Sequence, residues 1–390
     1  MPYFPVVKRI FRRRRSDVPE EEPPPVVTAC EPHEFDAAHE SLHDPASSVR
    51  VTGATHMGRL AREFPETRQK CVNAMCAYLR TPPSKTLITA SAKTRKPAPR
   101  TYTWHHGEDL VRAQLVTELR GVLAAYARDT SEGTLSGTVD LDLTGALLPP
   151  GINFVGVMFP GKTKFTGAIF TGDTYMQRST FVGKTAFAGA EFHGKVDFRR
   201  CSFHAQADFK EVNFFAHSNV EAAHFEEASF AGLASFAGAS FKGVAVFRKC
   251  AFANAAFTSS QFLSQSTFEH ARFTKKVNFS EIAFGGRAQF THTEFAGQAD
   301  FTGTSFTHEA DFSHAHFLKK STFAPVRFAT KANFDNTVFT ARSGAGGEEP
   351  DDSELLGVLR KSSQLPEPPG VVVPARTIGR RDVRWKRSTR

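Results

Sequence analysis

Phenylalanine recurs through the middle of this chain at steps of five and six residues. From Phe154 to Phe339 each rung of this ladder follows the last by five or six residues, and 33 of the 35 rungs are Phe. The two exceptions are Tyr175 and Val220. Only five of the 38 Phe in the chain lie off the ladder. A repeat this regular decides the fold before any other feature is considered.

A column of small side chains accompanies the aromatic one. Two residues before each rung, 31 of the 35 positions hold Ala, Ser, Thr, Cys or Val, and the same phase continues upstream into Leu148 and Leu143. In an extended chain, positions i and i−2 point to the same side. Each repeat therefore offers one large and one small group to a shared interior.

Helical and sandwich folds fit the ladder poorly. On a helix at about 100° per residue, successive rungs would fall about 140° apart and form two separate stripes. Gly recurs between rungs, as at Gly238, Gly297 and Gly303, which weakens a helix further. A sandwich or barrel needs longer strands and hairpin signals that the sequence lacks. The pattern predicts a solenoid that stacks Phe on Phe at the ~4.8 Å spacing of neighbouring strands.

The motifs around the rungs are specific enough to suggest a family. Ala-Asp-Phe or Val/Ala-Asn-Phe occurs at 207–209, 277–279, 299–301, 310–312 and 332–334. These motifs resemble those of pentapeptide-repeat proteins. The resemblance implies a mainly β fold, a right-handed quadrilateral β-helix with four repeats to a coil.

The resemblance also predicts the dimensions of the solenoid. The 37 rungs from Leu143 to Phe339 would give about nine coils and, at ~4.8 Å per coil, a rod on the order of 40 Å long. The sixth residue in alternate repeats departs from the family pattern. It implies 22 residues per coil and bulged corners on two faces.

Most residues of the ladder region are expected to build the core. Cys201 and Cys250 occupy the small position before a rung, so we interpret them as core filler rather than as reactive groups. The phase breaks at 170–187, 220–230 and 247–262 are interpreted as tolerated irregularities, with kinks or recognition features as the alternative.

Helices are predicted before the ladder. An antiparallel pair at 47–81 has apolar residues at helical spacing, with Ser47 or Ser48 as the first cap and Pro65 opening the second helix. This pair resembles the helical hairpin that precedes the repeats in many actinobacterial members of the family. A third helix is expected at about 107–128. Because a solenoid end must be covered, we expect these helices to cap the first coil near VDLDLTGALL.

The chain thus divides into six segments. The stretch after the ladder is rich in Gly, Pro and acids, which is typical of a linker. The predicted division is a disordered N-terminal arm at 1–46, a helical hairpin at 47–81, a basic Pro-rich loop at 82–101, a helix with a capping segment at 102–142, the β-helix at 143–339, and a disordered linker with a basic tail at 340–390.

The net charge of +9 comes from three segments outside the ladder. Residues 1–15 carry +6, residues 82–101 carry +5 and residues 376–390 carry +6, which leaves −8 for the remainder. Such basic arms could bind nucleic-acid phosphates, with one Trp available to stack on a base, or an anionic membrane surface. The candidate contacts are Lys8, Arg9, Arg12, Arg13, Arg14, Arg15, Arg380, Arg381, Arg384, Trp385, Lys386 and Arg387.

The cysteines and the apolar runs indicate a compartment. The five cysteines are an odd number, lie far apart and form no CxxC pair, which argues against a disulfide framework or a zinc module. The sequence has no signal-type apolar run at its start and no stretch of about 18 apolar residues. We therefore expect a cytoplasmic protein.

Signatures of catalysis are missing from the sequence. It has no phosphate-binding GxxxxGK[ST] loop, no GxSxG elbow and no HExxH. His105 and His106 lack partners at metal-ligand spacing, and nine further His are scattered along the ladder. His314 and His316 are predicted to share a strand, without a third ligand in register. We predict a protein that is not an enzyme and uses no cofactor or metal.

Three functions remain open from the sequence. The first is a scaffold for an unidentified protein partner, with a homodimer through a rod end as a further option. The second is mimicry of DNA against DNA gyrase or topoisomerase, as the family resemblance suggests, but 19 Lys and Arg against 15 Asp and Glu at 143–339 give +4, the wrong sign. The third is association with nucleic acid or an anionic membrane through the basic arms.

Overall fold

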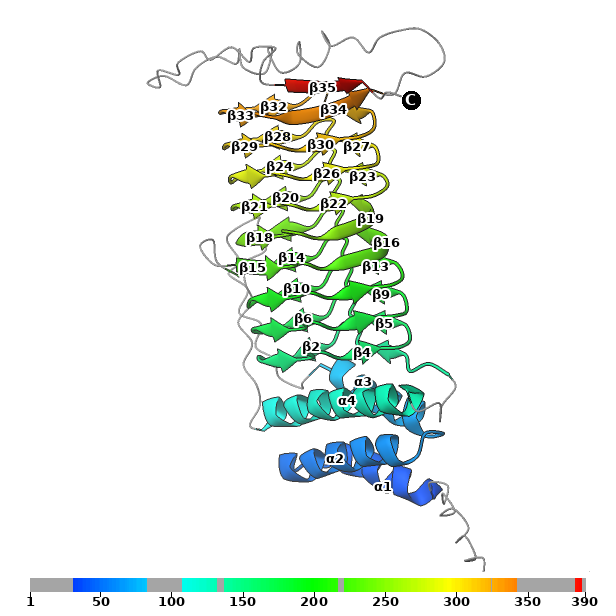
Figure 1. Cartoon of the computed structure of the whole chain (residues 1–390). Coiled ribbons are helices and arrows are strands. Elements are labelled where there is room, and N and C mark those ends of the chain that lie inside the picture. The colour runs from blue at the N-terminus through cyan, green and yellow to red at the C-terminus, as the bar shows by residue number, and fades with distance from the viewer. Residues whose placement is uncertain are drawn as a thin grey trace, which may run out of the picture.

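The protein is a four-sided β-solenoid that stands on a layer of helices (Figure 1). The solenoid makes about nine coils, and all its strand pairs are parallel, so the fold expected from the ladder is confirmed. The residues that the computed structural model describes are 31–82, 107–131, 137–216, 221–323, 325–341 and 383–387.

Four helices form the N-terminal cap. Their bounds are α1 Pro32–Leu42, α2 Ser47–Glu63, α3 Arg68–Arg80 and α4 Glu108–Ser131. No serine cap is present, because Ala46 occupies the N-cap position of α2 and makes no side-chain capping bond. Among the described residues, no helix is long and apolar enough to span a bilayer.

Helix α1 corrects the predicted N-terminal arm. The sequence prediction of disorder up to residue 46 is wrong over residues 32–42. Phe35, Ala38 and Leu42 recur at helical spacing and are buried, so the helix has an apolar face to place on α2. Pro32 at the start of the helix is a favourable first residue.

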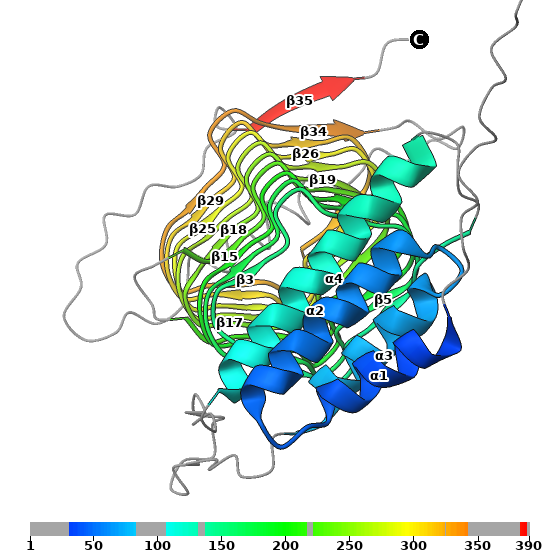
Figure 2. The ribbon, with the colours of Figure 1, turned by 90° about the horizontal axis from the view of Figure 1, so that it is seen from below.

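A buried arginine joins the cap to the first coil. The Arg112 side chain is 1% exposed, and its Nε donates to Glu108 Oε1 at 2.7 Å. Its Nη1 donates to the backbone oxygens of Leu79 at 2.8 Å and Leu147 at 2.9 Å. One guanidinium therefore links α4 to the end of α3 and to the solenoid. Figure 2 shows the helices lying across the end of the rod.

The carboxylate of Glu108 is shared by several donors. Its Oε2 accepts from the Tyr78 hydroxyl at 2.9 Å and from Arg50 Nη2 at 3.4 Å. Burial, followed by the negative charge of Glu108, raises the pKa of Tyr78 to about 12. Because the charged groups of Arg112 and Glu108 are both hydrogen-bonded, the interface holds an ion pair that would be costly to bury without those bonds.

Each side of the solenoid, here called a face, is built from short parallel strands. Face 1 contains β1 Leu141–Asp142, β5 Thr163–Lys164, β9 Thr185–Ala186, β13 Ala207–Asp208, β23 Val277–Asn278, β27 Ala299–Asp300 and β31 Ser321–Thr322. Face 2 contains β2 Leu147–Leu148, β6 Ile169–Phe170, β10 Glu191–Phe192, β14 Asn213–Phe214, β17 Ser240–Phe241, β20 Gln261–Phe262, β24 Ala283–Phe284, β28 Ser305–Phe306 and β32 Arg327–Phe328.

The other two faces follow the same rule. Face 3 contains β3 Ile152–Asn153, β7 Thr174–Tyr175, β11 Val196–Asp197, β15 Glu221–His224, β18 Val244–Val246, β21 Ser266–Thr267, β25 Ala288–Gln289, β29 Ala310–Asp311 and β33 Ala332–Asn333. Face 4 contains β4 Met158–Phe159, β8 Thr180–Phe181, β12 Ser202–Phe203, β16 Ser229–Ser235, β19 Ala251–Ala256, β22 Arg272–Phe273, β26 Glu294–Phe295, β30 His316–Phe317 and β34 Thr337–Ala341. Strands β16 and β19 continue round the corner and join face 4 to face 1.

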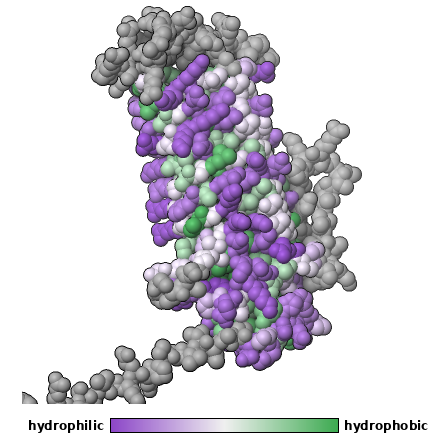
Figure 3. Space-filling model, turned by 90° about the vertical axis from the view of Figure 1, so that its right-hand side faces the viewer, coloured by the Kyte–Doolittle hydropathy of each residue, from purple (hydrophilic) through white to green (hydrophobic). Residues whose placement is uncertain are grey.

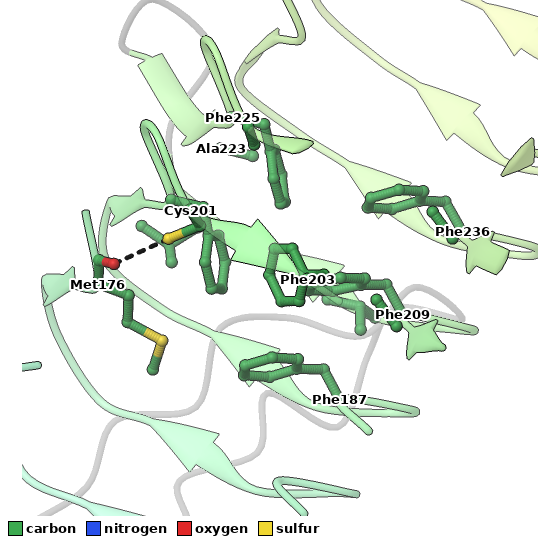
Figure 4. Close-up of a cluster of buried hydrophobic side chains, with 14 of the residues drawn as sticks. Met176, Phe187, Cys201, Phe203, Phe209, Ala223, Phe225 and Phe236 are labelled. Carbon is green, nitrogen blue, oxygen red and sulfur yellow. Dashed lines mark hydrogen bonds between the residues drawn. The ribbon is translucent and has the colours of Figure 1, made fainter. Parts of the chain in front are cut away.

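The rungs of the ladder form four columns inside the rod, one behind each face. Phe203, for example, stacks on Phe181 and Phe230 with ring centroids 4.6 and 4.7 Å apart. Figure 4 shows part of this interior, where the rings from successive coils lie over one another. Such rings bury roughly 150–250 Å² each, so each contributes several kcal/mol before chain entropy is subtracted.

The rung predicted at Tyr175 is wrong. Tyr175 is the last residue of β7 and is 38% exposed, whereas Met176 is fully buried and occupies the rung position. The step from Phe170 to Met176 is six residues and the next, to Phe181, is five. The alternation of five-residue and six-residue steps is therefore unbroken here. The rung was predicted at Tyr175 because an aromatic side chain was expected at each rung.

The other two phase breaks change the length of a coil. Most paired residues lie 22 apart, as predicted, but Phe214 pairs with Phe241, 27 residues on. The five extra residues fall between Phe214 and Phe225, so no ladder position remains for Val220, which itself lies outside the described residues. A later coil, paired as Phe241 with Phe262, has only 21 residues. The stack absorbs both changes without losing a rung.

Two of the four corners in each coil are tight turns. At these corners the Asp or Asn of the family motif accepts a hydrogen bond from the backbone N–H two residues later, as Asp208 does from Lys210 at 3.1 Å. This local bond is an Asx turn, and it explains the acid or amide before the rung. The same bond is made by Asp142, Asn153, Asp197, Asn278, Asp300, Asp311 and Asn333.

The C-terminal tail also differs from the prediction. The sequence predicted disorder throughout 340–390, but β35 (Val383–Arg387) pairs in parallel with β34. This strand continues face 4 beyond the last coil (Figure 1). One edge of the rod is thereby covered by the chain itself, which protects strand N–H and C=O groups from pairing with other chains.

Candidate interaction surface

The surface of the rod offers few apolar side chains. Figure 3 shows the side that carries β5, β9 and β13, where hydrophobic areas are small and separated by hydrophilic ones. On the described solenoid the large apolar residues that are clearly exposed are scattered singly: Tyr175, Val182, Leu233 and Leu263. Single exposed apolar residues are normal and mark no docking site. The distinctive surface features of the rod are therefore its polar corners.

The two tight corners share a backbone conformation and differ in their side chains. At both, one residue per coil has a positive φ. The corner between faces 1 and 2, here called the glycine corner, carries Gly145, Gly167, Gly189, Glu211, Gly238, Ser259, Glu281 and Gly303 at this position. The corner between faces 3 and 4, here called the charged corner, carries Gly156, Arg178, Arg200, Glu227, Lys249, His270, His292, His314 and Asn336.

The charged corner carries non-glycine residues in a backbone conformation that glycine adopts at a lower cost. The φ of its eight non-glycine residues is 56° to 61°. For an L-residue this left-handed conformation costs roughly 1–2 kcal/mol, and only Asn, Asp and His tolerate it fairly well. A Cβ added at Gly189 of the glycine corner would meet nothing within 4 Å, so φ alone selects glycine there. Strain that recurs along one edge points to a use for the side chains.

The half of the charged corner nearest the cap is an ion-pair ladder. Arg200 Nε lies 2.7 Å from Glu227 Oε2, and Lys249 Nζ lies 3.8 Å from Glu227 Oε1 in the next coil. Beside this column, Arg248 Nη2 lies 2.6 Å from Glu226. Burial alone would raise the pKa of Glu226, but the hydrogen bond and charge of Arg248 lower it below its usual value. These charges neutralise one another within the chain.

A shallow depression lies on the same half of the corner. Its volume is about 410 Å³. Of its side chains, Arg178 makes no ion pair with any described residue, and Gln177 Oε1 is buried without a hydrogen-bond partner. The lining residues are Val155, Gln177, Arg178, Arg199, Arg200, Glu226 and Glu227. Open and mixed in charge, the depression suits a protein surface better than a small molecule.

The other half of the charged corner carries a histidine ladder, defined as His270, His292 and His314. Ring centroids lie 4.8 Å apart for the first pair and 4.6 Å apart for the second, with interplanar angles of 3° and 13°. All three side chains are exposed. The pKa of His292 lies below its usual value. The larger cause is partial burial of the ring, and the next is repulsion from the positive charges that His270 and His314 would carry when protonated.

The histidine ladder was not predicted from the sequence. The prediction that His314 and His316 share a strand is wrong, because His314 lies at the corner and only His316 lies in β30. The ladder residues are 22 positions apart, so the coil length predicted from the rungs would have been enough to align them. The left-handed backbone in the other half of the charged corner, in contrast, had no signal, because neither Arg nor Lys predicts a positive φ.

Most predicted contact residues lie outside the described residues. These are Lys8, Arg9, Arg12, Arg13, Arg14, Arg15, Arg380 and Arg381. His105 and His106, which were not predicted as contacts, also lie outside the described residues. The remaining four, Arg384, Trp385, Lys386 and Arg387, belong to β35 and lie beside β34. Phosphate or membrane binding by these residues stays a prediction.

The two cysteines of the solenoid are core residues, as predicted. Cys201 is fully buried, and its thiol donates to the Met176 backbone oxygen at 2.8 Å (Figure 4). Cys250 makes the equivalent bond to Phe225 at 2.9 Å. Burial raises the pKa of Cys201 to about 12, which leaves the thiol protonated and unreactive. Among the described residues, no three His, Cys, Asp or Glu are placed to hold a metal ion.

Comparison with known families supports the repeat assignment. A family model described as pentapeptide repeats (9 copies) matches residues 154–202, 236–282 and 268–316. All these segments lie within the solenoid, and the unmatched gap at 203–235 contains the five residues that lengthen one coil to 27. Comparison with curated proteins and with solved structures gave no match. The matched repeats and the four-sided coil together show that the solenoid is built of pentapeptide repeats.

Proposed function

We propose that this protein is a non-enzymatic interaction scaffold whose charged corner recognises a protein partner. The observation that carries the proposal is the contrast between the two tight corners. Eight of nine left-handed positions on the charged corner hold a non-glycine residue, against three of eight on the glycine corner. A purely structural edge would favour glycine, because glycine relieves the strain at no steric cost.

The geometry of the corner suits recognition of a surface. Its side chains come from consecutive coils, so neighbours along the rod lie about 4.8 Å apart on a rigid backbone. A repeat solenoid presents such a row in a fixed order without loop rearrangement. The match to the repeat family supports the coarser statement, a repeat scaffold. Recognition through this corner is our addition.

The two alternatives from the sequence find less support. Duplex DNA carries one negative charge per ~1.7 Å of its axis, and a net charge of +4 over residues 143–339 does not imitate it. Binding through the basic arms rests on residues that mostly lie outside the described part of the chain. Arm binding would weaken steeply with salt, which gives a way to separate it from the corner.

The test compares matched variants of the full chain as bait in nuclease-treated lysate at 0.5 M salt. One variant changes Lys249, His292 and His314 of the charged corner to Asn, which tolerates a positive φ. The control changes Glu211, Ser259 and Glu281 of the glycine corner to Asn. We expect the control and the unmodified chain to retain the same protein and the charged-corner variant to lose it. Equal retention by all three baits would overturn the proposal, provided that their circular dichroism and unfolding midpoints agree.

A further inference from the structure

The two halves of the charged corner differ in how their charges are satisfied. Arg200, Glu227 and Lys249 are joined by ion pairs. By contrast, among the described residues no hydrogen bond or ion pair is made by the side chains of His292 or His314, whose contacts are the stacked rings. Of the ladder, only His270 lies within ion-pair distance of a described acid, with Nε2 3.7 Å from Glu269 Oε1. The histidine ladder is thus the half with unused hydrogen-bonding capacity.

Charged and titratable groups surround the ladder on each side. Along the corner, Lys249 lies one coil below His270, Glu269 precedes it, and Asp335 lies one coil above His314. On face 3, Asp311 precedes the turn. On face 4, the charged or titratable neighbours are Arg272, Glu294 and His316. At the four turns of the charged corner formed by residues 269–270, 291–292, 313–314 and 335–336, the charged groups are the carboxylates of Glu269 and Asp335 while the rings are neutral. Three protonated rings would change the charge of these turn residues from −2 to +1.

We propose that the histidine ladder is a docking site for a short acidic protein segment, which it binds when the imidazoles are protonated. This proposal rests on the proposed function, since it names the partner chemistry of the same corner. Three imidazolium groups in one row would offer carboxylates a set of charge-assisted N–H donors. The neutral row, bounded by carboxylates, would repel the same segment.

The size of the row favours a short peptide segment over nucleic acid. Three rungs span two coil steps, or about 10 Å along the rod. Glu269 and Asp335 bound this row, one toward each end. A nucleic-acid backbone carries charge continuously and would meet those carboxylates, whereas a few acidic side chains can stop short of them.

The lowered pKa of His292 is consistent with a switch of this kind. The cause is partial burial, followed by repulsion from His270 and His314, so protonation of one ring opposes protonation of the next. A bound acidic segment would remove part of that repulsion and raise the pKa of the ring. Binding and protonation are then coupled, each favouring the other.

The test measures binding of a fluorescein-labelled oligo-aspartate peptide to the full chain at pH 7.5 and pH 5.0. Aspartate stays largely ionised at both values, so the change in charge comes mainly from histidine. We expect roughly tenfold tighter binding at pH 5.0, because a few exposed charge pairs form between the protonated rings and the peptide. In a variant with His270, His292 and His314 changed to Asn, this gain should disappear. The basic arms are present in both proteins, so their contribution cancels.

Two controls keep the outcome decisive. A variant with Ser259, Glu281 and Glu211 of the glycine corner changed to Asn should keep the gain at pH 5.0. A single-stranded oligonucleotide of similar charge should show no gain that depends on the ladder, and such a gain would overturn the choice of a peptide. A single variant, His292→Asn, replaces the triple one if the latter unfolds.

Failure of this inference is distinguishable from failure of the proposed function. If binding of the peptide is the same at both pH values, or is equally pH-dependent in the triple variant, the histidine proposal is wrong. A partner lost at pH 7.5 by the charged-corner variant would still support the scaffold. If the peptide shows no dependence on the ladder and no partner depends on the corner, both are wrong.

Discussion

The glycine corner and the charged corner share a backbone conformation but carry different residues at its left-handed position. Both are tight turns with an Asx bond at the start and a left-handed residue in the middle. The glycine corner fills this position with glycine five times in eight, and the charged corner once in nine. Geometry alone therefore does not choose the residue. The difference indicates that stability was given up along one edge in exchange for side chains, as is common at functional sites.

The largest expected effect comes from making the charged corner resemble the glycine corner. Changing His270, His292 and His314 together to Gly should stabilise the protein. Because His tolerates this conformation better than most residues, the relief of strain exceeds the extra chain entropy of glycine by about 0.5 kcal/mol per site, so the sum is about 1.5 kcal/mol. The measurement is the urea unfolding midpoint at pH 7.5. A lower midpoint would mean that ring stacking contributes more than the strain costs.

The reverse change on the glycine corner should destabilise. Gly189→Ala forces an L-residue to a φ of 66° with no steric clash, because a Cβ there meets nothing within 4 Å. We expect a loss of about 1 kcal/mol, and a smaller loss for Gly189→Asn because Asn tolerates this conformation. Equal midpoints for Gly189→Ala and the unmodified chain would show that the corner backbone adapts, and the contrast between corners would lose its meaning.

A smaller effect is expected from the ion-pair ladder. Glu227→Gln removes the partner of Arg200 and Lys249, whose side chains are 57% and 54% exposed. Exposed pairs are worth roughly 0–1 kcal/mol, so the midpoint should fall only slightly and the difference should shrink at high salt. A double-mutant cycle with Arg200→Gln measures the pair. A large coupling that salt leaves unchanged would contradict this assignment.

The smallest effect is a pH dependence that belongs to the histidine ladder. Because the pKa of His292 is lowered in the folded state, the unfolded chain binds the proton more readily. The contribution of this ring to stability is complete above the ordinary histidine pKa of about 6.5 and is lost as the pH falls through the folded-state value. Unfolding midpoints between pH 8 and pH 5 should fall less steeply for His292→Asn. A steeper fall would reverse the sign of the coupling.

Sequence alone predicted the core much better than the surface. Burying a ring is so favourable that Phe recurs at nearly every interior position, and the spacing reveals the coil. Rungs were predicted wrongly where a residue other than Phe fills the interior, as Met176 does, or where extra residues lengthen a coil, as near Val220. Helix α1 has apolar residues at helical spacing, but the acidic residues around them favoured a prediction of disorder. Pairing of β35 with β34 depends on contacts across some 40 intervening residues, which no local pattern reports.

The histidine ladder was the least predictable feature, although its residues are simply 22 apart. Alignment by coil length would place His270, His292 and His314 in one column. Their left-handed conformation follows from the turn, however, and the cost of that conformation is visible only when the two corners are compared. The candidate site thus emerged from backbone geometry and not from a motif.

The attachment of the helical cap by Arg112 bears on how the chain reaches its fold. No coil can form alone, since each strand has only two or a few residues and needs a neighbour to pair with. The cap is made first during synthesis, and its link to the Leu147 oxygen gives the first coil a surface on which to settle. Later coils can then add in order, each closing a loop of about 22 residues. Assembly from the N-terminus avoids the slow, long-range searches that parallel sheets otherwise require.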